Sequence, residues 1–237
     1  MFNAKAQKKQ RPVMTTDLPA GPPVPSEYIG VWKRTLLRTP MTEDTTSQVY
    51  WMQTQSWHAD IRVPANRPSF APKTALNQLN RNELLELARQ QGFFGATLID
   101  GNICRWLRHY DFQPPTGAND IGRMVFDTPD RLFEYGVEAD YFEIWERMPG
   151  SPGKSSAVQV CVDPLTLRLS AGKYAMSVRP RARPLPTACS LTAMLENKDD
   201  QTLRAALDFE INFGRQFSSN GWRIELSTLP WLAGLPI

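Results

Sequence analysis

A short segment with strictly alternating side chains constrains the fold of this chain most strongly. Apolar and polar residues take turns along Trp57-His58-Ala59-Asp60-Ile61-Arg62-Val63. Because successive side chains of a β-strand point to opposite faces, the pattern predicts a strand with one apolar and one polar wall. His58, one of only two histidines in the chain, shares the polar wall with Asp60 and Arg62.

The rest of the sequence predicts many short strands and few helices. Strand-like segments, separated by turns that contain Pro, Gly or Asp, cover residues 27–37, 45–54, 94–99, 103–112, 121–127, 131–137, 141–148, 158–162, 166–169, 174–178, 207–213 and 222–227. Helical spacing appears at 76–88, where Asn80 and Glu83 fit a capping box, and in two pieces between 190 and 206. Since helices do not alternate with strands, we expect an all-β fold with two or three accessory helices, an antiparallel barrel or barrel-like sandwich.

Length and composition suggest one main domain with a short arm. Residues 1–25 are basic and rich in Pro, so we expect a disordered arm there and a β-barrel domain over 26–237. The Trp-x-Arg pattern of Trp32-Lys33-Arg34 recurs as Trp145-Glu146-Arg147. This recurrence is consistent either with duplicated barrel halves, 26–139 and 140–237, or with chance in a chain rich in tryptophan.

The charge distribution and the apolar runs exclude several classes of partner. The net charge of +3 is concentrated in the first eleven residues, and no basic face with interleaved aromatic residues follows, so no nucleic-acid partner is predicted. No apolar run approaches the ~18 residues of a membrane span. The basic N-terminus lacks the apolar core of a signal peptide, so we expect a cytoplasmic protein without a membrane partner. The three cysteines match neither a disulfide framework nor a zinc site.

The candidate site is sought on strands whose polar face is too rich in aromatic, histidine and arginine side chains to be an ordinary solvated surface. A closed barrel of eight to ten strands can hold one small ligand, and ligand pockets combine apolar walls with a few converging polar groups. Strict alternation along 103–112 places Trp106, Arg108 and Tyr110 on one face and His109 on the other. The predicted ligand-binding residues are Arg62, Trp106, Arg108, His109, Tyr110, Tyr135, Tyr141, Trp145 and Arg147.

Three further residues on the same predicted strands, His58, Asp60 and Glu143, could perform acid–base chemistry. His58 can exchange a proton near neutral pH, with Asp60 raising its basicity. Glu143 in an apolar pocket would have a raised pKa and could act as a general acid. The alternative is a structural role, because Arg–carboxylate pairs inside a barrel often hold its walls together. No nucleophile elbow, phosphate-binding glycine loop, dinucleotide fingerprint or metal-ligand spacing is present, so no metal and no cofactor is predicted.

Three functional hypotheses remain open at this stage. The first is a module that binds a small, partly apolar organic ligand in the barrel cavity. The second is a cofactor-free isomerase, hydratase or cyclase that uses His58 or Glu143 as acid–base. The third is a structural protein that binds a partner through its edge strands and the basic arm. The oligomeric state is left open, with a homodimer as one candidate. A cavity with unpaired His and Glu would favour the enzyme, one with every charge paired would favour binding or structure, and a filled barrel would favour the partner-binding protein.

Five motifs together resemble a family of proteins. They are Gly30-Val31-Trp32-Lys33-Arg34, His58-Ala59-Asp60-Ile61-Arg62-Val63-Pro64, Asp111-Phe112-Gln113-Pro114-Pro115, Glu143-Ile144-Trp145-Glu146-Arg147 and Ser227-Thr228-Leu229-Pro230-Trp231. The set resembles an uncharacterised bacterial family distantly related to fungal proteins built of lipocalin-like (calycin) β-barrels. The resemblance implies a barrel with an interior cavity and no established activity, in which the Gly-x-Trp tryptophan closes the base against an Arg or Lys from a late strand. Haem-binding relatives of this barrel type exist, but no residue here matches an axial histidine.

Overall fold

The computed structural model describes residues 20–218 and 221–237, and most of the predicted arm (1–25) lies outside this range. Eight antiparallel strands form a closed barrel, which confirms the all-β, lipocalin-like prediction. The barrel strands are β1 (Gly30–Arg38), β3 (Gln48–Gln53), β4 (Trp57–Val63), β5 (Gln91–Asp100), β6 (Ile103–Asp111), β7 (Ile121–Thr128), β8 (Arg131–Gly136) and β9 (Phe142–Arg147). The short β2 (Glu43–Asp44) pairs antiparallel with the end of β1, and pairing between β1 and β9 closes the barrel.

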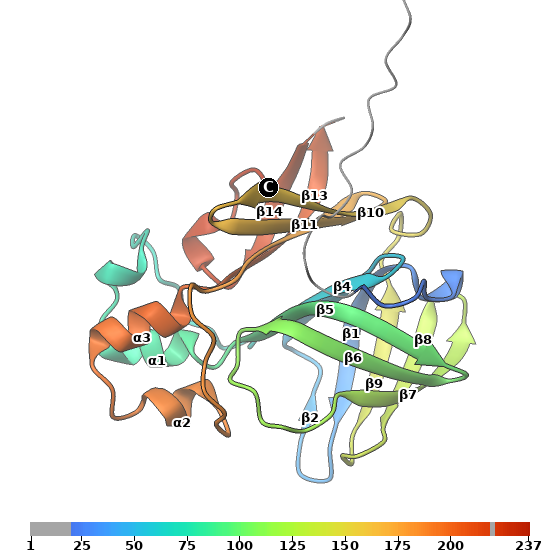
Figure 1. Ribbon diagram of the computed structural model, residues 1–237, viewed down its shortest axis with the longest axis horizontal. Coiled ribbons are helices and arrows are strands. Elements are labelled where there is room, and N and C mark those ends of the chain that lie inside the picture. The colour runs from blue at the N-terminus through green and yellow to red at the C-terminus, as the bar shows by residue number, and fades with distance from the viewer. Residues whose placement is uncertain (1–19, 219–220) are drawn as a thin grey trace, which may run out of the picture.

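A second antiparallel sheet packs on the outside of this barrel (Figure 1). Its strands, in order, are β10 (Ser155–Val162), β11 (Leu165–Ala171), β12 (Tyr174–Arg179), β13 (Glu210–Ser218) and β14 (Gly221–Ser227). The helices α1 (Arg81–Leu87), α2 (Leu191–Leu195) and α3 (Asp200–Leu207) gather at one end of both sheets. The predicted capping box of α1 is present, since the Asn80 side chain accepts from the Glu83 amide and Glu83 accepts from the Asn80 amide.

The two walls of β4 are both buried, but in different cores. Its apolar wall, which includes Ala59 and Ile61, packs in the core that the barrel shares with the second sheet, where Ile211 and Leu167 also lie. Its polar wall points into the barrel, because Asp60 pairs laterally with Trp51 and Phe93, two residues of the interior aromatic cluster. The predicted alternation is therefore confirmed, and a strand with two such walls fits only between two cores.

The two Trp-x-Arg segments lie side by side and close the barrel. In the antiparallel register of β1 and β9, Trp32 pairs with Arg147 and Arg34 pairs with Trp145. The Arg147 guanidinium lies 4.5 Å from the Trp32 ring, and the Trp32 indole N–H donates to the Tyr28 carbonyl at 2.8 Å. This is the base closure that the lipocalin-like resemblance implies. The duplication of residues 26–139 and 140–237 stays a prediction.

A bulge in β6 changes which side chains face the interior. Pairing with β5 jumps from Phe94–Tyr110 to Gly95–Arg108, so His109 lies outside the ladder. As a result Trp106 and Arg108 face the barrel interior, whereas Tyr110 stacks on Phe94 in the outer core. The predicted common face of Trp106, Arg108 and Tyr110 is therefore wrong at Tyr110, because one extra residue reverses the alternation beyond it.

Candidate functional site

Buried ion pairs line the barrel interior. Arg34 Nη1 donates to Glu143 Oε1 at 2.8 Å and its Nη2 donates to Asp44 Oδ2 at 3.0 Å. Arg62 Nε donates to Asp60 Oδ1 at 2.8 Å, and its Nη1 lies 4.0 Å from the same Glu143 oxygen. Burial raises the pKa of Glu143, and the positive charges of Arg62 and Arg34 oppose that rise. Two of the three predicted catalytic residues, Asp60 and Glu143, are thus each paired with an arginine.

The hydrogen bonds around His58 fix its tautomer. Gln53 Nε2 donates to the carbonyls of Thr54 and Trp57, which orients its Oε1 toward Thr97. The Thr97 hydroxyl gives its single proton to this Oε1 at 2.7 Å, so at 2.9 Å it can only accept from His58 Nδ1. His58 therefore carries its proton on Nδ1, and its buried Nε2 has no hydrogen-bond partner among the described residues. Burial, reinforced by the charge of Arg108, holds the pKa of His58 well below its usual value, so the ring is neutral.

Glu134 of β8 is a buried carboxyl group without an arginine partner in the described chain. Its Oε1 accepts from the Tyr141 hydroxyl at 2.7 Å and its Oε2 from the Trp145 indole N–H at 3.0 Å. Burial raises the pKa of Glu134 well above its usual value, and the nearby charge of Glu143 raises it further. Glu134 therefore retains a proton at pH values where an exposed glutamate has lost it.

Because Glu134 stays protonated in the folded protein, the free energy of unfolding is expected to depend on pH, and Glu134→Gln should abolish this part of the pH dependence. Above pH ~4.3 the unfolded chain releases the Glu134 proton while the folded chain keeps it, so stability falls as pH rises toward the folded-state pKa. Relative to Glu134→Gln, the parent is expected to lose up to about 1.4 kcal/mol per pH unit in this window. Urea unfolding between pH 4.5 and 7 measures the difference. Glu146→Gln, on the exposed face of β9, is the matched control, and a pH-independent gap for Glu134→Gln would contradict the assignment.

The barrel interior is almost filled by side chains. Aromatic rings occupy its centre, with Trp51 in edge contact with Trp106 and Trp145 at 5.7 and 5.9 Å between centroids. The space left among Trp51, Asp60 and Glu134 is about 10 Å³, enough for about one water molecule. The wall composition predicted from the sequence is confirmed, whereas the ligand-sized cavity predicted inside the barrel stays a prediction that this small space does not support. Strand alternation shows which side chains face inward and does not show how completely they fill the interior.

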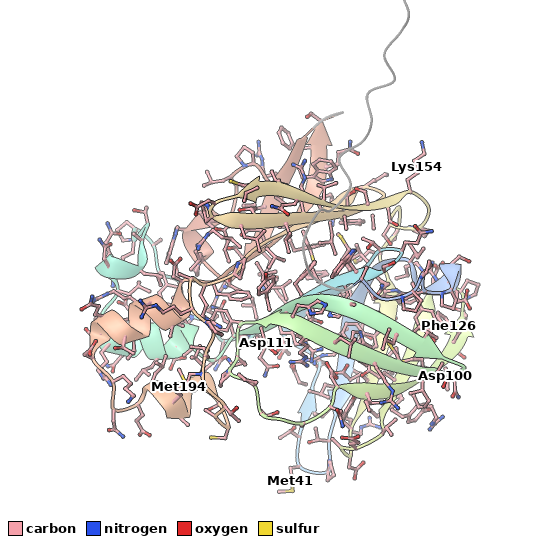
Figure 2. All side chains as sticks on the ribbon, in the orientation of Figure 1. Met41, Asp100, Asp111, Phe126, Lys154 and Met194 are labelled. Carbon is pink, nitrogen blue, oxygen red and sulfur yellow. The ribbon has the colours of Figure 1, made fainter. Side chains whose placement is uncertain are left out.

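A large pocket lies outside the barrel, between β6, the β10–β11 turn and the linker that follows β12. This pocket, the interlayer groove, has a volume of about 1150 Å³. Figure 1 shows the β10–β11 hairpin above β5 and β6, and Figure 2 places Asp111 where β6 leaves the barrel. The interlayer groove is lined by both apolar and charged side chains. The larger nonpolar and aromatic ones are Tyr110, Leu165, Leu185 and Phe209, and the charged ones are Arg108, Asp111, Asp163, Arg179, Arg181 and Asp208.

Arg181 is the most unusual charge of the interlayer groove. Three of its five N–H groups donate to the carbonyls of Ala206, Asp111 and Phe112 at 2.7–2.8 Å. No carboxylate lies within ion-pair distance of it in the described ranges, in contrast to Arg108 and Arg179. Burial lowers the pKa of Arg181 to about 10, and the more distant Asp111 and Asp208 only partly offset this. The groove therefore holds a partly buried cation, two of whose N–H groups have no acceptor among residues 20–218 and 221–237.

The structure divides the predicted site residues between three places. The barrel interior holds His58, Asp60, Arg62, Trp106, Tyr141, Glu143 and Trp145. The interlayer groove is lined by His109 and Tyr110, and by Arg108 from its rim. Tyr135 packs against Phe142 and under Arg123 on the opposite face of β8 from Glu134, and Arg147 belongs to the barrel base. The catalytic and ligand-binding roles assigned to them stay predictions.

Several residues of the interior and the groove escape sequence reasoning. Arg34 and Thr97 lie in segments that alternate like any other strand, so only the register shows that they meet Glu143 and His58. Arg181 lies in the segment 180–186, between elements, where no periodicity predicts burial. Glu134 is different, because its strand lies next to the predicted wall of Tyr141, Glu143 and Trp145 in the sequence and we expect it to join that wall. The structure brings Glu134 to Tyr141 and Trp145.

Neither a metal site, nor a membrane-spanning helix, nor a similar known protein is found for the described part of the chain. No group of His, Cys, Asp or Glu in the described ranges is arranged to hold a metal ion. Over the same ranges no helix is both long and apolar enough to cross a bilayer. The sequence matches no protein-family model, no curated protein and no solved structure. The eight-stranded antiparallel barrel is consistent with a lipocalin-like fold, and the kinship to fungal barrel proteins stays a prediction.

Proposed function

We propose that this protein binds a small, partly apolar organic ligand, and that the ligand occupies the interlayer groove rather than the barrel. The observation that carries the proposal is the groove itself, whose 1150 Å³ slightly exceeds the usual range of ligand pockets. Its apolar side chains, among them Tyr110, Leu165 and Phe209, can bury the body of such a molecule. The barrel, with room for about one water molecule, serves in this account as the rigid support for one groove wall.

The N–H groups of Arg181 that lack an acceptor in the described chain favour a ligand with a polar or anionic group. A buried guanidinium gains most from a hydrogen-bond acceptor when its remaining donors are unmatched by the protein. A carboxylate, sulfonate or carbonyl oxygen of the ligand would satisfy the two N–H groups of Arg181 that the protein leaves over. Asp163 and Asp208 line the same groove, so the acceptor is expected near Arg181 and away from these carboxylates.

Filling the groove tests the proposal without removing a native contact. Ala182 is an exposed groove residue, and Ala182→Trp is expected to occupy the ligand volume. The probe is 8-anilinonaphthalene-1-sulfonate, an apolar anion, titrated by fluorescence. We expect its Kd to rise at least about 10-fold in Ala182→Trp, a loss of about 1.4 kcal/mol.

The matched control is Ala139→Trp, an exposed alanine of the β8–β9 loop that lies outside the groove. It is expected to bind the probe like the parent. Equal affinities in all three proteins would show that the probe does not bind in the interlayer groove and would remove the support for the proposal.

A further inference from the structure

The edge strand β10 lacks the usual protection of a sheet edge. It is hydrogen-bonded to β11 on one side, and no strand pairs with its other side in the part of the chain that the structure describes. Its sequence, Ser155-Ser156-Ala157-Val158-Gln159-Val160-Cys161-Val162, contains no charge, no proline and no glycine. Natural edge strands usually carry such residues because exposed backbone N–H and C=O groups template pairing with another chain. One protective feature is present, a bulge that leaves Val160 outside the pairing with β11.

The other edge of the same sheet is covered, which makes the contrast informative. The C-terminal residues fold back along β14, where Arg223 and Pro236 form a bridge. The Ile224 amide donates to the Leu235 carbonyl at 2.8 Å, and the Ile237 amide donates to the Trp222 carbonyl at 3.0 Å. Along β10, by contrast, the side chains of Val160 and Val162 are 51% and 78% exposed. A partner strand that pairs with β10 would therefore bury both valines. The edge at β14 offers no such gain, because the C-terminal residues already cover it.

One positive and one negative residue flank β10, so two antiparallel copies of this strand would place opposite charges next to each other. Lys154 precedes the strand and Asp163 follows it, and both are exposed. Neither forms an ion pair within residues 20–218 and 221–237. Figure 2 shows Lys154 projecting away from both sheets. If β10 pairs antiparallel with a second β10 about a two-fold axis at Val158, and Val160 stays out of this ladder as it does out of the pairing with β11, each Lys154 lies opposite an Asp163. Side chains of opposed residues lie on the same face of an antiparallel sheet, and the bulge at Val160 brings Lys154 and Asp163 onto one face.

We propose that two copies of this chain associate through antiparallel pairing of their β10 strands, forming one continuous sheet across the dimer. The contact is isologous, because the same strand serves both copies about a two-fold axis. It satisfies the unpaired backbone groups of β10, covers Val160 and Val162, and forms two Lys154–Asp163 ion pairs. It goes beyond the proposed ligand binding and does not depend on it.

A charge swap tests this dimer in the full-length protein. Sedimentation velocity over a concentration series gives the dimer Kd of the parent. Lys154→Asp and Asp163→Lys each place like charges opposite one another at both ends of the pairing, so each is expected to raise the Kd by about 10-fold. The double variant Lys154→Asp/Asp163→Lys restores opposite charges and is expected to return the Kd toward the parent value. High salt is expected to narrow these differences.

Lys198→Asp, an exposed charge reversal between α2 and α3, is the matched control and is expected to leave the Kd unchanged. Circular dichroism confirms that each variant keeps its fold. A parent that is monomeric at every concentration would overturn the proposal. So would a dimer whose Kd is the same in both single variants, or a double variant no tighter than the single ones. Because Lys154 lies outside the interlayer groove, its effect on dimerisation is separable from any effect on ligand binding.

Discussion

Replacing Arg34 with methionine is expected to lower the free energy of unfolding by about 3–5 kcal/mol. Arg34 is buried and donates to Glu143 at 2.8 Å and to Asp44 at 3.0 Å. Methionine offers no donor, so the buried Glu143 carboxylate would keep only Arg62, at 4.0 Å. Removing one member of a buried ion pair is costly because the remaining charge is left without compensation. Urea unfolding at pH 7 measures the loss.

Two further variants separate the effect of burial from the effect of losing an arginine. Arg38→Met removes an ion pair with Glu43 from the same strand, but both side chains are more than half exposed, so the expected loss is within about 1 kcal/mol. The double variant Arg34→Met/Glu143→Met removes both charges and is expected to recover much of the loss. An Arg34→Met protein as stable as Arg38→Met would contradict the assignment of this pair to the barrel interior.

Replacing Trp32 with alanine is expected to cost about 3–5 kcal/mol, the usual range for removing a fully buried tryptophan. The indole is completely buried, donates to the Tyr28 carbonyl and stacks under Arg147. Arg147 in turn donates to the carbonyls of Glu27 and Ile29, so the tryptophan supports the whole barrel base. Thermal and urea unfolding give the measurement.

The matched control is Trp222→Ala, because Trp222 lies on β14 of the second sheet and is only partly buried. Its expected loss is less than half that of Trp32→Ala. A Trp32→Ala protein that loses no more stability than this control would show that the base closure contributes little to the fold.

The sequence predicts the strands well because their periodicity is local. Alternation along β4 identifies both its walls, and the segments around β5 to β9 are bounded by turn residues such as Asp100-Gly101. The capping pair Asn80 and Glu83 fixes the start of α1 for the same reason. Which side chains meet inside the barrel depends on which strands are neighbours and on their register. Local periodicity in a single sequence specifies neither.

Two features show where local pattern fails. The bulge in β6 reverses the faces of His109 and Tyr110, and it forms where Gly95 allows the Leu107 carbonyl to approach. A Cβ at Gly95 would lie 1.8 Å from the Leu107 carbonyl oxygen. The filling of the barrel depends on how the rings of Trp51, Trp106 and Trp145 interlock, which composition does not reveal.

The interlayer groove depends on contacts between segments far apart in the chain. Arg181 meets the end of β6 and the end of α3, and none of these three segments predicts the others. The sequence predicts a ligand inside the barrel because strand periodicity reveals the polar walls there. It missed the pocket that forms only when the barrel and the second sheet come together.

Native mass spectrometry of the full-length protein, purified from its own host without denaturation, tests ligand binding in the groove most directly. The account predicts that the parent and Ala139→Trp retain a small organic molecule, which dissociates on collisional activation. It predicts that Ala182→Trp does not retain it. A parent without any bound small molecule, or an Ala182→Trp protein that carries the same one, would contradict the account.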